Sequence, residues 1–164
     1  FTDDDTLSFM FYSKDGDLYV GGRSNIFSGL IYKLNPLSDS WVEIINRIDE
    51  PYEMAGGISH DLWIRTRTST VYNFRNDGTH IKSYGMYAYL KNNHIDGMTV
   101  DISGNVWMIQ RTATQTLIHI IDQSQTISTS SLRLPYASSI GTASSHDPII
   151  GFGGANRLTI WKKK

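Results

Sequence analysis

Short runs in which apolar and polar residues alternate follow one another along the chain, and one such run recurs at a fixed spacing. The segments 15–23 (DGDLYVGGR), 59–67 (SHDLWIRTR) and 103–111 (SGNVWMIQR) each join a polar turn to an apolar stretch that ends in arginine. Successive copies are 44 residues apart, and a degraded fourth copy, DPIIGFGG, occupies 147–154. A constant internal period of this length indicates a fold assembled from repeated supersecondary units.

Within each period the apolar runs are short, rich in β-branched and aromatic residues, and bounded by Gly, Asn, Asp or Pro. This pattern is typical of β-strands joined by tight turns. In the first period the runs are 7–11, 18–22, 29–34 and 41–45. No stretch keeps helical spacing over three turns, so we expect strands rather than helices.

Four-stranded antiparallel meanders that recur every ~40–45 residues are typical of a β-propeller, in which each meander forms one blade. The sequence therefore predicts an all-β propeller of about four blades, forming a single domain or segment over 1–164. The expected blades are 7–45, 52–84, 95–129 and 136–161.

Two positions of the repeat have a structural interpretation. Tyr19, Trp63 and Trp107 occupy the same place in successive copies, so we expect each ring to fill the gap between neighbouring blades as part of the core. In the turn before this strand, Gly16 and His60 stand in equivalent places. Glycine and, less readily, histidine tolerate the left-handed backbone that such a turn requires.

The repeat also resembles known propeller families. The segments 101–107 (DISGNVW), 15–22 (DGDLYVGG) and 29–36 (GLIYKLNP) resemble the repeat of two-component-regulator propellers, the periplasmic sensor halves of bacterial hybrid histidine kinases. The stretch 94–108 (HIDGMTVDISGNVWM) is similar to propellers of the gluconolactonase and streptogramin-lyase type. Both resemblances imply the propeller fold, but propellers have many functions, so neither settles what the protein does.

The last copy leaves no room for an outer strand, which raises the question of how the ring closes. Residues 1–6 could supply the missing strand, the chain could be a segment of a larger propeller, or the ring could be completed between chains. An open arc would leave apolar blade faces exposed, and such faces normally find a partner. We therefore expect a protein partner or self-association through blade faces.

Composition excludes several classes of protein. The 164 residues carry a net charge of −1, which argues against nucleic-acid binding, and no apolar run is long enough to cross a membrane. The chain has no cysteine, which excludes disulfides and thiol catalysis but leaves the compartment open. The basic end WKKK (161–164) is interpreted as a solvated tail. Because the first residue is Phe1 rather than Met, we expect a processed product, an excised piece or the ordered part of a longer protein.

Arg23, Arg67 and Arg111 recur at the 44-residue period, in the expected loop after the second strand, and are the strongest candidates for function. Arginine binds carboxylate, sulfate or phosphate groups through two parallel hydrogen bonds, so the three could form an anion site. The links between blades, however, carry polar residues in matching places that could hold the arginines, namely Asp4 and Asp5, Asp49 and Glu50, and then Asn93 and Asp96. The preferred hypothesis is that at least two of the arginines clamp these links.

Other candidate sites have weaker support. His94 and Asp96 stand two residues apart on an expected inner strand, where they could contact a ligand or act as a base with its orienting carboxylate. The resemblance to gluconolactonase-type enzymes implies a divalent metal, for which Glu53, Asn93 and Asp96 are the matching residues. The acidic run 3–5 lacks the spacing of a calcium loop. We therefore predict no cofactor, with a divalent metal such as Ca²⁺ as the alternative.

The sequence as a whole favours a non-enzymatic recognition or assembly module, a ligand-sensing or protein-interaction segment of a larger bacterial extracytoplasmic protein. The expected location is periplasmic or extracellular, and a small anionic or carbohydrate ligand is a candidate partner. Two alternatives stay open. One is a metal-dependent lactonase or lyase, and the other is a structural component of a virion, such as a phage tail, or of a cell surface.

Overall fold

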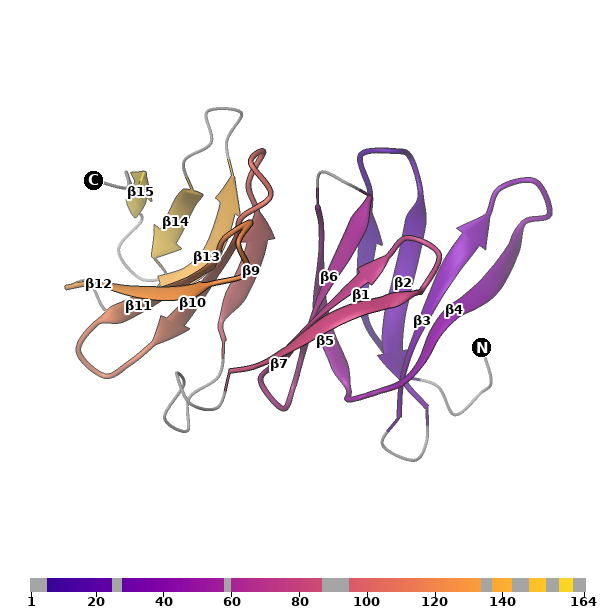
Figure 1. Cartoon of the computed structure of the whole chain (residues 1–164), viewed down its shortest axis with the longest axis horizontal. Helices are drawn as coiled ribbons and strands as arrows, with labels where there is room; N and C mark the ends of the chain where they lie inside the picture. Colours follow the sequence, from indigo (N-terminus) through magenta and orange to yellow (C-terminus); the bar gives the residue numbers. More distant parts are fainter. Residues whose placement is uncertain are drawn as a thin grey trace. The chain divides into compact units, whose positions relative to one another are not determined.

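The computed structural model describes most of the chain (Figure 1), namely residues 6–24, 28–57, 60–86, 95–133, 137–142, 148–152 and 157–160. Every regular element in these ranges is a β-strand. The prediction of an all-β fold without helices is therefore confirmed for the described residues. The same part of the chain contains no helix long and apolar enough to cross a membrane.

The strands divide between two compact units. The first unit contains two four-stranded antiparallel meanders in which consecutive strands are neighbours. The first sheet comprises β1 (Thr6–Tyr12), β2 (Leu18–Arg23), β3 (Gly29–Asn35) and β4 (Ser40–Ile48). The second sheet comprises β5 (Pro51–Gly56), β6 (Asp61–Thr66), β7 (Thr70–Arg75) and β8 (His80–Gly85).

The second unit repeats this plan. Its complete meander, the third sheet, comprises β9 (Gly97–Val100), β10 (Val106–Arg111), β11 (Thr116–Ile121) and β12 (Ile127–Leu132). The fourth sheet has three described strands, β13 (Ala137–Thr142), β14 (Pro148–Phe152) and β15 (Arg157–Ile160). Four successive meanders confirm the predicted blade repeat. The prediction that residues 1–164 form one domain or segment stays a prediction.

The repeated aromatic residues are buried, as predicted. Tyr19 packs in the core between the first two sheets, in a cluster that includes Ile31 and Ile64. Trp107 has the same role between the third and fourth sheets. Trp63 is also buried, with its ring centroid 5.7 Å from that of Tyr84 on β8. These rings are therefore core residues rather than a stacking surface for a ligand.

The turn before each second strand has the predicted left-handed backbone. The φ angles are 86° at Gly16, 61° at His60 and 84° at Gly104. A residue with a Cβ atom is strained in this region, although histidine enters it more readily than branched residues do. The one correction concerns the arginines, because Arg23 and Arg111 end β2 and β10 rather than lying in the following loop.

Candidate functional site

The repeated turn that contains Asp101 holds Trp107 in place. The buried Asp101 carboxylate accepts hydrogen bonds from the backbone N–H groups of Ser103 and Asn105, each at 2.9 Å, and from the Asn105 side chain at 2.8 Å. The Trp107 indole N–H donates to the same carboxylate at 2.8 Å. The motif 101–107 thus has a structural role in the third sheet, and the position of Asp101 is explained without any need for a ligand.

The first copy of this turn is built differently. Ser13 takes the place of the aspartate, and its hydroxyl accepts the Asp17 backbone N–H at 3.1 Å. The Tyr19 hydroxyl donates to the Asp17 carboxylate at 3.2 Å. Burial and, secondly, the negative charge of Asp17 raise the pKa of Tyr19, so its hydroxyl stays protonated and can donate to Asp17.

Two of the three repeated arginines, Arg23 and Arg67, lie in the first unit and meet at one carboxylate. The Nη1 atom of Arg67 lies 3.4 Å from Oε2 of Glu50, and the Nη1 atom of Arg23 lies 3.8 Å from the same oxygen. The Arg67 backbone N–H also donates to the Glu50 carbonyl at 2.9 Å. Glu50 lies in the link between the first two sheets, as the clamp hypothesis expected, but the sharing of one acid by two arginines was not predicted.

The third arginine has its own acid. Arg111 donates from its backbone N–H to Asp96 at 2.6 Å and from Nε to the other carboxylate oxygen at 3.0 Å. The Asp96 backbone N–H in turn donates to the carbonyl of Ile109 at 2.7 Å. Asp96 is therefore fixed at the start of the third sheet as the partner of Arg111. His94, its proposed catalytic companion, lies outside the described residues, as do Asn93 and the acidic run 3–5.

Glu53, which the resemblance offered as a metal ligand, is held by an arginine that the sequence analysis missed. Both Nε and Nη2 of the buried Arg65 lie 3.0 Å from Oε2 of Glu53. The guanidinium carbon also lies 4.6 Å from the ring centroid of Tyr52. Within the described ranges no three His, Cys, Asp or Glu side chains come together to hold a metal ion.

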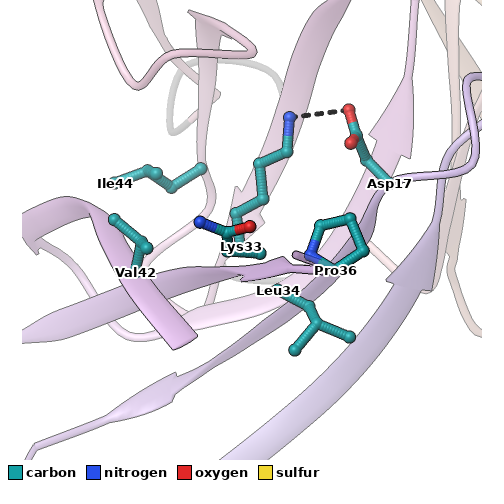
Figure 2. Close-up of a pocket in the computed structure, with 7 residues that line it drawn as sticks. Asp17, Lys33, Leu34, Pro36, Val42 and Ile44 are labelled. Atoms are coloured by element: carbon teal, nitrogen blue, oxygen red, sulfur yellow. Dashed lines mark hydrogen bonds and ion pairs between the residues drawn. The ribbon is translucent and has the colours of Figure 1, made fainter. Parts of the chain in front are cut away.

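A shallow groove of about 330 Å³ opens on the first sheet (Figure 2). Lys33 donates to the Asp17 carboxylate at 2.7 Å along one side, and its ammonium group lies 5.6 Å from the Tyr19 ring centroid. The remaining lining is mostly apolar and comes from Leu34, Asn35, Pro36, Val42 and Ile44. The volume of the groove is at the lower end of the range for small-molecule pockets. Its two charged side chains, Lys33 and Asp17, already neutralise each other.

The sites therefore differ in what they can bind. Arg111, Arg65 and Lys33 each have a carboxylate at 3.0 Å or less. Arg23 and Arg67 share one carboxylate at longer distances and are at least partly exposed, so their remaining donors can reach a ligand. Whether Arg23, Arg67, Arg111, His94 and Asp96 bind a ligand stays a prediction.

Comparison with known proteins supports the fold. No protein family matches the sequence, and no curated protein matches it either. Among solved structures, virginiamycin B lyase from Staphylococcus aureus matches 99% of this chain and 57% of its own with a TM-score of 0.69 and 14% identity. A putative gluconolactonase matches 91% of this chain and 55% of its own with a TM-score of 0.62 and 13% identity.

A third structure is PorZ, a bacterial surface component of the type-IX secretion system of Porphyromonas gingivalis. It matches 96% of this chain but only 25% of its own, with a TM-score of 0.66 and 17% identity. The chain has the fold of a β-propeller, and its structural neighbours include propellers of the gluconolactonase and streptogramin-lyase type. It spans a little over half of the length of those enzymes.

Proposed function

We propose that this chain is a non-enzymatic β-propeller segment for recognition or assembly, within a larger bacterial extracytoplasmic protein. Glu53 and Asp96, which would be metal ligands in an enzyme of the gluconolactonase type, are each paired with an arginine at 3.0 Å. The match of nearly the whole chain to a quarter of PorZ, a bacterial surface component, supports a role as one segment of a larger protein at the cell surface. A sensor role in a two-component system and a role in a virion are variants of this proposal.

The observation that carries the recognition role is the sharing of Glu50 by Arg23 and Arg67. The two guanidinium groups bring two positive charges to this carboxylate, and its contacts with them are 3.4 and 3.8 Å long. Each guanidinium has five N–H donors in a planar fork, which suits the oxygen atoms of carboxylate, sulfate or phosphate groups. An anionic group of a ligand would therefore bind between the two side chains and displace little protein structure.

Binding of pyrophosphate, a small multivalent anion, tests this site. Replacing Arg67 or Arg23 with Ala should weaken binding by ~1.5–3 kcal/mol, the range for hydrogen bonds to charged groups. Isothermal titration calorimetry at low salt measures the affinity, which should decrease as salt is added because exposed charges are screened. Arg67→Lys, which keeps the charge but loses the planar fork, should lose part of the affinity.

The matched control is Arg133→Ala, because Arg133 is exposed and lies just after β12. This variant should bind pyrophosphate like the unmodified chain. Thermal unfolding of Arg67→Ala should be nearly unchanged, since exposed ion pairs contribute only ~0–1 kcal/mol to stability. A clear loss of stability without a change in affinity would instead show that the arginines only clamp the link.

A metal-dependent lactonase or lyase is the second candidate, and the names of two structural neighbours favour it. In the presence of Ca²⁺ or Mg²⁺, we expect the chain to leave a sugar lactone and a streptogramin B antibiotic intact, because Glu53 and Asp96 are already paired. Chromatography of the two compounds after incubation with the chain shows whether any hydrolysed or cleaved product has formed. Metal-dependent turnover would establish the enzyme instead, provided that Asp96→Asn abolishes it. Asp77→Asn, a change in an exposed turn, should leave such turnover intact.

A further inference from the structure

The groove on the first sheet combines one ion pair with an aliphatic lining (Figure 2). Lys33 and Val42 face each other across β3 and β4, so their side chains lie on the same face of the sheet. Ile44, which the register of these two strands skips as in a β-bulge, also lines the groove. Leu34 and Pro36 complete the apolar part. The groove therefore offers a charged part and an aliphatic part to the same ligand.

The shape of the groove is fixed by the strands around it. The Ile44 side chain also packs against the core between the first two sheets. The turn between β7 and β8 approaches the Ile44 carbonyl so closely at Gly78 that no Cβ atom would fit there. A preformed site loses less conformational entropy when a ligand binds, which helps a shallow groove to hold a small ligand.

The ion pair keeps hydrogen-bonding groups for a ligand. The contacts of Asp17 with Lys33 at 2.7 Å and with the Tyr19 hydroxyl at 3.2 Å both use Oδ2, so among the described contacts Oδ1 is open. The Lys33 ammonium group has three N–H donors and directs one of them at Asp17. The side chains of Lys33 and Asp17 are 28% and 24% exposed, so a ligand can reach both. An acceptor for an ammonium group thus lies next to donors for a carboxylate.

The charges of the groove select the kind of ligand. The pair of Lys33 and Asp17 has no net charge, so it attracts neither a simple anion nor a simple cation from a distance. A ligand that carries both charges side by side can pair with both partners at once. The aliphatic lining favours an apolar side chain on this ligand. The volume of about 330 Å³, at the lower end for small-molecule pockets, suits a single amino acid rather than a peptide.

We propose that this groove binds a free amino acid with an aliphatic side chain. The α-carboxylate accepts hydrogen bonds from Lys33, the α-ammonium group donates to Oδ1 of Asp17, and the side chain packs on Val42. The ligand uses donors and acceptors that the ion pair leaves open, so it replaces no protein contact. Asp17 precedes β2 and Arg23 ends it, so this groove and the arginine pair lie at opposite ends of one strand. The proposal therefore does not depend on the anion site.

Titration of the isotope-labelled chain with L-leucine, followed by two-dimensional NMR of its amide groups, tests the proposal. The amide signals of Asp17, Lys33 and Val42 should shift together, with a dissociation constant in the millimolar range that suits a small ligand in a shallow site. Isocaproate lacks the ammonium group of leucine, isoamylamine lacks the carboxylate, and glycine lacks the side chain. Each should bind about 10-fold more weakly, because one charged hydrogen bond or one apolar contact is lost.

Two variants of similar side-chain size separate the roles of the two charges. Lys33→Met leaves Asp17 as the charged partner, so it should bind isoamylamine more tightly than isocaproate. Asp17→Asn leaves Lys33 charged and should show the opposite preference. Both variants should bind leucine about 10-fold more weakly. Lys82→Met is the matched control, because Lys82 lies on β8 outside the groove, and it should bind leucine like the unmodified chain.

Three outcomes would overturn the proposal. The first is that no amide signal shifts up to the solubility limit of leucine. The second is that leucine and its three analogues bind equally well, and the third is that leucine shifts only signals outside the groove. The comparison of ligands needs only the unmodified chain, so it decides the question even where a variant fails to fold.

Discussion

Replacing Trp107 with alanine should lower the free energy of unfolding by about 3–5 kcal/mol, the usual cost of truncating a large buried ring. The side chain is 4% exposed and packs with Ile109, Ile118 and Ile150 between the third and fourth sheets. Truncation would leave a cavity in this core, and the Asp101 carboxylate would lose the indole donor at 2.8 Å. Urea denaturation followed by circular dichroism measures the change.

Two further substitutions separate the loss of core packing from the loss of the indole hydrogen bond. Trp107→Phe keeps most of the ring but removes the indole N–H, so it should lose only ~1–3 kcal/mol, the cost of an unsatisfied buried group. Leu37→Ala is the control, because Leu37 is 97% exposed in the turn between β3 and β4, and its loss should be below 1 kcal/mol, as is usual for a surface change. A loss below about 1 kcal/mol for Trp107→Ala would contradict the core role of the ring.

The fold could be predicted because its signals are local and repeated. Strand alternation, the turn glycines and the fixed aromatic position each depend on residues close together in sequence. The left-handed turn at His60 followed from its place relative to Gly16. Equivalent positions of the repeat can still differ in burial, since Met10 and Met54 are 44 residues apart but only Met54 is buried.

The candidate site was predicted less completely, because its pairs depend on the register between strands and on the links between sheets. The period located Arg67 and Arg111, and the acids at Glu50 and Asp96 were expected partners. Arg65 was missed, although it lies directly opposite Glu53 in the β5–β6 pairing. A bulge between Pro51 and Glu53 sets this register, and the sequence pattern of β5 does not reveal it.

His119 is another residue whose role the sequence did not reveal. It is fully buried on β11, with Nε2 at 2.9 Å from the Gln110 side-chain oxygen and Nδ1 at 3.0 Å from the Thr129 hydroxyl. In the neutral ring that this network fits, Nε2–H donates to Gln110 and Nδ1 accepts from Thr129. Burial disfavours the charged form and lowers the pKa of His119 from 6.5 to about 4.

The stability of the chain should therefore fall as the pH is lowered from 6.5 to 4. Between these values the unfolded state binds a proton at His119 and the folded state does not, so acid favours unfolding. The 2.5-unit difference between 6.5 and 4 corresponds to about 3 kcal/mol, fully present above pH 6.5 and lost by pH 4.

Urea denaturation at several pH values measures this loss, and His119→Gln, which has no titrating ring, should lose about 3 kcal/mol less over the same range. His80→Gln is the control for removing a histidine ring from an exposed position, since His80 is exposed on β8 and lies 3.0 Å from the Ser83 hydroxyl. Parallel pH dependences for the unmodified chain and His119→Gln would show that His119 takes up its proton without unfolding the sheet.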